Sequence, residues 1–179
     1  GGTTGITVIA LAGIVCDQSI RIAGDEFTAD IMEALRRYHS LLIGERTAEQ
    51  IKIQVGAAMK DLENPPEDIP VNGRDLVTGI PKQVMVSYQE VAEALDKSIF
   101  KIEEAILKAL ETTPPELAAD IYRRGLYITG GGALLRGLDK RLTNKIKLPV
   151  HVADDPLKSV VRGTGIALKN YDRFPFVMR

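Results

Sequence analysis

The most informative run in the chain is Leu126-Tyr127-Ile128-Thr129-Gly130-Gly131-Gly132-Ala133-Leu134-Leu135-Arg136-Gly137-Leu138. An apolar run rich in β-formers meets three consecutive glycines, and leucines at helical spacing follow. This pattern predicts a strand, a tight turn and a helix over residues 134–146. Glycine lets the backbone adopt positive φ and approach a ligand closely, and the N–H groups of a helix start favour an anion or the polar edge of a nucleotide. A purely structural strand-to-helix turn would give the same pattern, because a glycine turn without fixed spacing is weak evidence of a site.

A second glycine turn, Gly1-Gly2-Thr3-Thr4, opens the chain and leads into the apolar residues 6–11. Two such turns in one chain favour a ligand site over a structural turn alone. A phosphate-binding glycine turn normally follows a strand. We therefore expect this chain to be a piece of a longer protein, and its first residue to follow directly after a strand of that protein.

Composition bounds the class of protein. The 179 residues suffice for one domain or two small lobes, and 45% hydrophobic with 26% charged residues are ordinary for a globular chain. The net charge of −1 gives no support for a nucleic-acid partner. The chain has one cysteine, Cys16, which excludes an internal disulfide and is interpreted as a structural thiol. His39 and His151 each stand alone in the sequence, so we assign no metal ligand. No apolar run reaches the ~20 residues of a membrane-spanning helix.

Apolar periodicity and turn residues predict strands and helices that alternate along the chain. Besides the strand of the central run, strands are expected at residues 5–12, 14–22, 69–72, 83–86 and 150–152. Besides residues 134–146, helices are expected from Asp25 to about His39, from Thr47 onward, and over 91–95, 99–111, 117–123 and 159–169, followed by a docked or loose tail at 171–179.

Several local signals define the helix starts. We expect Asp25 to cap the first helix, and Thr47 with Gln50, and Ser87 with Glu90, to form capping boxes. Gly163 and Gly165 fall inside the last helix, where glycine is tolerated if the helix passes close to a neighbour. Residues 24–96 are interpreted as an insertion with its own small sheet, and residues 1–23 and 97–179 as one α/β lobe.

Five runs together resemble the MreB family of bacterial rod-shape-determining actin homologues. They are residues 1–4 (GGTT), 42–49 (LIGERTAE), 73–79 (GRDLVTG), 113–121 (TPPELAADI) and 129–138 (TGGGALLRGL). The resemblance covers nearly the whole chain but only the second half of the family's proteins. It implies an α/β fold, namely an actin-like ATPase (ribonuclease H-like) lobe with a smaller inserted α+β subdomain. The lobe, called subdomain IIA, would be residues 1–23 and 97–179, and the insertion, called subdomain IIB, would be residues 24–96.

The resemblance also implies a nucleotide site, with ATP or ADP and Mg²⁺ bound between this half and the missing half. Gly1, Gly2 and Thr3 match the family's second phosphate loop, although Gly5 stands where the family usually has an acidic residue. Ala48, Glu49 and Lys52 match the helix that contacts adenosine; by themselves they fit an exposed helix start equally well. The adenosine loop is matched by Gly130, Gly131, Gly132 and Ala133.

The family resemblance implies a function for the whole protein. It would bind ATP, polymerise into membrane-associated filaments in the cytoplasm, at the inner face of the cell membrane, and organise cell-wall synthesis to set rod shape. Expected partners are other copies of the protein, the membrane adaptor RodZ and the cell-wall synthesis machinery, with membrane contact through the missing half. The full-length protein is expected to be an ATPase and this piece alone nearly inactive, so no catalytic residue is assigned.

A sugar or carboxylate kinase of the same superfamily is the alternative, because it would share the glycine turns and the split-lobe fold. A kinase needs a general-base carboxylate in a pocket facing a hydroxyl group. The acidic candidates Asp25, Asp75 and Asp120 all fall at predicted caps, turns or helix ends, where a structural role suffices.

Overall fold

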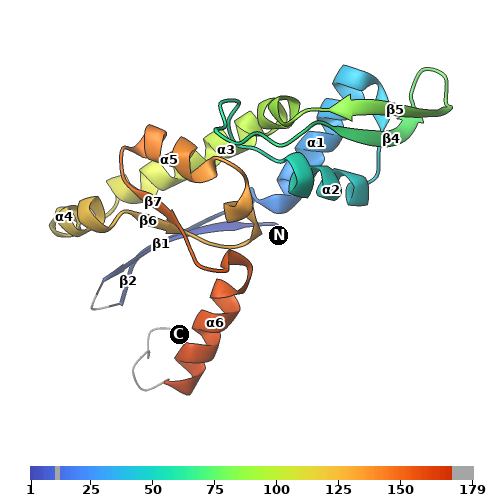
Figure 1. Ribbon diagram of the computed structural model, residues 1–179. Coiled ribbons are helices and arrows are strands. Elements are labelled where there is room, and N and C mark those ends of the chain that lie inside the picture. Colours follow the sequence, from blue (N-terminus) through green and yellow to red (C-terminus); the bar gives the residue numbers. More distant parts are fainter. Residues whose placement is uncertain (11–12, 171–179) are drawn as a thin grey trace.

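The structure is a computed structural model that describes residues 1–10 and 13–170. Its helices and strands are, in chain order, β1 (Thr4–Ala10), β2 (Gly13–Ile20), α1 (Gly24–His39), β3 (Leu41–Leu42), α2 (Glu45–Val55), β4 (Ile69–Asp75), β5 (Pro81–Val86), α3 (Tyr88–Glu111), α4 (Pro115–Arg124), β6 (Leu126–Ile128), the 3-10 helix η1 (Gly131–Leu134), α5 (Leu138–Ile146), β7 (Val150–Val152) and α6 (Pro156–Lys169) (Figure 1).

Three small sheets organise the strands. β1 and β2 form an antiparallel pair in which Thr4 lies opposite Ile20. β3, β4 and β5 form an antiparallel sheet in that order, and β6 pairs in parallel with β7. The predicted strands 69–72 and 83–86 are confirmed as a hairpin, and the strand at 150–152 is confirmed as β7.

The long helix α3 connects the two ends of the molecule (Figure 1). Its buried stripe includes Leu95, Ile99, Ile102 and Ile106, which belong to one core cluster with residues of α1, α2, β4 and α5. The separate helices expected at 91–95 and 99–111 are therefore wrong. No helix-breaking residue lies between them, and the apolar stripe continues through both at helical spacing. The predicted boundary between residues 96 and 97 falls inside this one helix.

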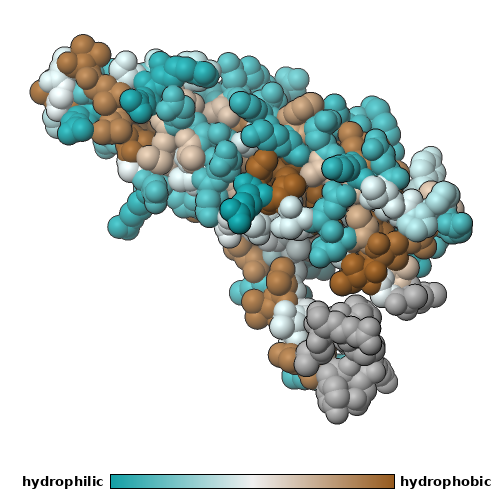
Figure 2. Space-filling view, turned by 180° about the vertical axis from the view of Figure 1, so that it is seen from behind, coloured by the Kyte–Doolittle hydropathy of each residue, from teal (hydrophilic) through white to brown (hydrophobic). Residues whose placement is uncertain are grey.

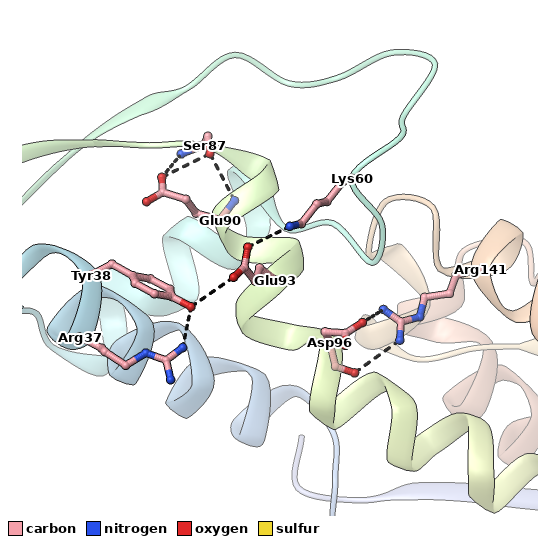
Figure 3. Close-up of polar contacts among 8 residues, drawn as sticks. All are labelled: Arg37, Tyr38, Lys60, Ser87, Glu90, Glu93, Asp96 and Arg141. Atoms are coloured by element: carbon pink, nitrogen blue, oxygen red, sulfur yellow. Dashed lines mark hydrogen bonds and ion pairs between the residues drawn. The ribbon is translucent and has the colours of Figure 1, made fainter.

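Polar contacts hold neighbouring segments to α3 (Figure 3). Lys60 pairs with Glu93 at 2.9 Å, and Arg141 of α5 pairs with Asp96 at 2.7 Å. Arg141 also donates to Glu103 at 2.6 Å and to the carbonyl of Ala58 at 3.0 Å. Because only 4% of the Glu103 side chain is exposed, this guanidinium neutralises a carboxylate inside the molecule.

Helix starts agree with local signals in one case and differ in three. The capping box of Ser87 and Glu90 is confirmed at the start of α3. Asp25 does not cap α1, because the N-cap is Ala23 and makes no side-chain bond. Thr47 does not cap α2, which begins two residues earlier after Gly44. The helix predicted from 134 begins at Leu138, because Gly137 adopts a left-handed φ of 74° that separates it from η1.

The last helix extends away from the described rest of the molecule (Figure 1). A Cβ added at Gly163 or Gly165 would meet nothing within 4 Å in the part of the chain that the structure describes, so no described neighbour accounts for these two glycines. The residues from 171 on, predicted as a tail, lie outside the described part. None of the described helices combines the length and apolar character needed to cross a membrane.

Candidate nucleotide site

The first glycine turn precedes β1 and lies beside the start of α1. The backbone N–H of Asp25 donates to the carbonyl of Gly1 at 3.3 Å. A Cβ added at Gly1 would lie 2.5 Å from Oδ1 of Asp25, so a side chain there would displace this carboxylate. Gly1, Gly2 and Thr3 are exposed, which leaves their backbone open to a ligand.

The neighbourhood of Asp25 is a feature that sequence reasoning missed. Asp25 is separated from the turn by 24 positions, and only the return of β2 into α1 brings its carboxylate next to Gly1 and Gly2. A carboxylate here repels a bare polyphosphate and tolerates one whose charge a divalent cation reduces. The residues present therefore fit a nucleotide that carries Mg²⁺ better than one without it.

The edge of α2 carries a compact polar cluster. The ammonium of Lys52 contacts Glu49 at 2.6 Å, the carbonyl of Gly24 at 2.8 Å and the hydroxyl of Thr28 at 3.0 Å. These three acceptors match its three N–H donors. The bond from Lys52 lowers the pKa of Glu49 and outweighs the opposite effect of burial, so Glu49 stays ionised. Ala48 differs from both, because it is fully buried in the core.

The second glycine turn connects β6 to η1. Gly130 adopts φ 84°, which favours glycine, and its N–H donates to the carbonyl of Pro156 at 2.9 Å. Gly131 and Gly132 are exposed with ordinary φ, and a Cβ added at Gly132 would meet nothing within 4 Å of the described chain. Neither backbone strain nor crowding by the described residues explains a glycine at position 132. Ala133 packs into the interior.

Neighbours of both turns lie near the two ends of α2. At its outer edge, a Cβ added at Gly24 would lie 3.4 Å from Nζ of Lys52 and 3.6 Å from the carbonyl oxygen of Gly1. At its end, the N–H of Arg136 donates to the carbonyl of Gly56 at 3.4 Å, and the N–H of Ala58 donates to Arg136 at 2.8 Å. Residues that neighbour each turn therefore lie near one end of α2, and a single ligand groove rimmed by all three segments stays a prediction.

The carboxylates considered for a kinase lie in three different places. Asp75 accepts a bond from the N–H of Val77 within the β4–β5 turn, and Asp120 pairs with Arg123 on the surface of α4. Only Asp25 lies beside a glycine turn. A small apolar hollow between α1 and α3, lined by Ile31, Leu35 and Val91 among others, belongs to neither turn.

Comparisons with known proteins identify the family of the chain. A family model described as MreB/Mbl protein matches residues 1–175. The cell shape-determining protein Mbl of Bacillus subtilis (strain 168) is 49% identical over 175 residues, which are 98% of this chain and 52% of Mbl. The cell shape-determining protein MreB of Escherichia coli (strain K12) is 46% identical over 172 residues, 96% of this chain and 49% of that protein. The chain spans about half the length of the curated relatives it matches.

Solved structures give the same result. The crystal structure of MreB5 of Spiroplasma citri bound to ADP superposes with a TM-score of 0.91 at 37% identity, covering 98% of this chain and 53% of that one. A second MreB5 structure is bound to AMPPNP, with a TM-score of 0.91 and 36% identity, covering all of this chain and 53% of that one. A MamK double helical filament gives 0.69 at 25% identity, covering 87% and 48%. The predicted actin-like α/β fold is confirmed.

Proposed function

The chain belongs to the MreB/Mbl family, and from this premise we propose that it is the C-terminal half of an actin-like cytoskeletal protein that sets cell shape. The whole protein binds ATP, polymerises into membrane-associated filaments and organises cell-wall synthesis. This chain supplies one side of the nucleotide site and part of the filament contacts. Subdomain IIB is residues 24–96, and subdomain IIA is the remainder.

The observation that supports the nucleotide site is that Gly24 lies near both Gly1 and Lys52, and that Arg136, after the second turn, bonds to Gly56 at the end of α2. Exposed backbone at Gly1–Thr3 offers N–H groups to phosphates, and Gly130–Gly132 offers a flat surface for adenosine. Gly132 supports this assignment most directly, since nothing in the described chain requires a glycine there. Glu49 and Lys52 are assigned to the same site, where a nucleotide hydroxyl would replace one of their present partners.

The cation proposed for this site is Mg²⁺. When bound, it neutralises phosphate charge. Asp25 would lie on the side of the cation, because its carboxylate borders Gly1 and Gly2. The described residues hold no group of three or more His, Cys, Asp or Glu side chains that could bind a metal ion, so the phosphates themselves would supply ligands.

ATP hydrolysis is proposed for the full-length protein and not for this chain alone. A ligand site needs walls on most sides, and the turns described here form one wall. The piece alone is therefore expected to bind nucleotide weakly and to turn over almost none.

Partners and location follow from the same proposal. Other copies of the protein are the first partner, and a filament structure of the related MamK supports this choice. RodZ and the cell-wall synthesis machinery are further proposed partners, at the cytoplasmic face of the membrane. Membrane contact is assigned to the half of the protein that this chain does not span.

The test is the binding of a fluorescent ATP analogue to the full-length protein. We expect Gly132→Ala to weaken binding about tenfold, equivalent to ~1.4 kcal/mol, because a methyl group holds adenosine away from the backbone. The melting temperature should not change, since the added Cβ meets open space. Gly163→Ala is the matched control, because that glycine is equally open but lies in α6. Unchanged affinity in Gly132→Ala would contradict the proposed site.

A further inference from the structure

Thr28 of α1 lies inside the polar cluster at the edge of α2, although none of the sequence signals for the site includes it. The residue is 8% exposed. Its hydroxyl oxygen lies 3.0 Å from Oε2 of Glu49, 3.0 Å from the carbonyl oxygen of Gly24 and 3.0 Å from Nζ of Lys52. Two of the three α2 residues assigned to the nucleotide site therefore contact one buried hydroxyl.

This hydroxyl has two possible acceptors and one hydrogen. An ammonium group can only donate, so Lys52 occupies a lone pair of the Thr28 oxygen. The O–H of Thr28 can then donate either to Glu49 or to the carbonyl of Gly24. Rotation about the C–O bond exchanges these two bonds without moving a heavy atom. Thr28 can therefore hold the Glu49 carboxylate and release it without leaving its own hydrogen unpaired.

Glu49 is the member of this cluster that a ligand can reach. Its side chain is 49% exposed, whereas that of Lys52 is 15% exposed. The bonds from Lys52 and from Thr28 lower the pKa of Glu49, so its carboxylate is ionised at neutral pH and can only accept hydrogen bonds. A ligand group that binds Glu49 must therefore donate a hydrogen. A sugar hydroxyl does so, and an ionised phosphate does not.

We propose that Thr28 is a positioning residue of the nucleotide site, which holds Glu49 in place for a ribose hydroxyl. In the empty site the O–H of Thr28 donates to Glu49. When a ribose hydroxyl donates to Glu49 instead, the O–H of Thr28 turns to the carbonyl of Gly24, and Lys52 keeps all three of its acceptors. This inference rests on the proposed function and specifies its ligand as a nucleotide that carries ribose hydroxyls.

The test compares the affinity of the full-length protein for ATP and for 2′,3′-dideoxy-ATP, which lacks both ribose hydroxyls. Wild type should bind ATP about tenfold more tightly, because only ATP can donate to the Glu49 carboxylate. Thr28→Val removes the hydroxyl at nearly constant side-chain size. It should weaken ATP binding about fivefold, the usual effect of one lost hydrogen bond, and leave dideoxy-ATP binding unchanged. A residue with only a structural role would weaken the binding of both nucleotides equally.

Two further variants serve as controls. Thr28→Ser keeps the hydroxyl and should keep the wild-type preference for ATP. Thr164→Val is the matched control, because the Thr164 hydroxyl likewise donates to a carbonyl four residues earlier in its helix, that of Val160, at 2.9 Å. Thr164 lies in α6, which projects from the described molecule (Figure 1) and already presents hydrophobic residues at its surface (Figure 2). Its replacement by valine should change the affinity for neither nucleotide.

The possible results separate this inference from the proposed function. Equal weakening of both nucleotides in Thr28→Val, or no change in either, would overturn the inference, and so would loss of the preference for ATP in Thr28→Ser. If Thr28→Val does not fold, Thr28→Ala also removes the hydroxyl and is judged by the same results. A wild type that binds ATP and dideoxy-ATP equally well would overturn the inference and leave the nucleotide site standing. A wild type that binds neither would overturn both.

Discussion

Glu90 shows how one side chain connects two helices. Its carboxylate accepts from the N–H of Ser87 at 3.0 Å, completing the cap of α3, and contacts Nε2 of His39 at the end of α1 at 2.7 Å. Burial acts to raise the pKa of Glu90, but the bonds from Ser87 and His39 outweigh it and leave the pKa below 4.5. A carboxyl group whose pKa is lower in the folded than in the unfolded state stabilises the fold at pH values above the unfolded-state pKa. This stabilisation is lost as the pH falls through the folded-state pKa.

Replacement of Glu90 should therefore have an effect that depends on pH. At neutral pH, Glu90→Ala is expected to lose about 1 kcal/mol of unfolding free energy, the usual cost of a lost cap. Glu90→Gln should lose less, because glutamine can complete the capping box. Urea unfolding measures both, and the difference from wild type should shrink as the pH falls below 4.5. A loss in Glu90→Ala that is the same at every pH would contradict this role.

The two contacts of Glu90 differ in how far sequence could predict them. Ser87 and Glu90 are three residues apart, so their box is visible as a local pattern. His39 is 51 positions away, and only the packing of α1 against α3 brings it close. The same distinction holds for Asp25, whose position beside Gly1 depends on the path of β2 and not on any local signal.

At the scale of the elements, a buried ion pair links α5 to α3. Arg141 of α5 satisfies Glu103 and Asp96 of α3 together with the carbonyl of Ala58. Arg141→Met would leave Glu103 buried and charged, and is expected to cost about 3–5 kcal/mol. The double variant Arg141→Met, Glu103→Leu should recover most of that loss, since it removes the unpaired charge.

Urea unfolding of these variants has a matched control in the same helix. Lys140 pairs with Glu63, but both side chains are at least half exposed, so Lys140→Met should leave stability nearly unchanged. Equal losses in Lys140→Met and Arg141→Met would show that burial of the pair does not determine its contribution.

Periodicity predicted whether a segment is a helix or a strand more reliably than it predicted the residues at which that segment begins and ends. The apolar stripe over residues 99–111 was visible in sequence, yet the single helix α3 that continues it from Tyr88 was predicted as two. The start of α5 depends on the positive φ of Gly137, a property that glycine permits but sequence does not require. The confirmed hairpin carried stronger local signals.

At the scale of the whole molecule, α3 connects its two ends (Figure 1), and the nucleotide-facing side is a proposal. The fold was predictable because several family runs occur together in one sequence, and the matched structures confirm it. The site was predictable only as segments. Sequence named the glycine turns and the α2 edge, and in the structure Gly24 lies near both Gly1 and Lys52, while Arg136 bonds to Gly56 after α2.

A crystal structure of the full-length protein with AMPPNP and Mg²⁺ tests this central claim most directly. We predict that phosphate oxygens accept from the backbone N–H groups of Gly1–Thr3. The adenosine should lie against Gly130–Gly132, with Glu49 or Lys52 at the ribose. A nucleotide that contacts only one glycine turn, or binds away from α2, would contradict the claim that these three segments form one wall of the site.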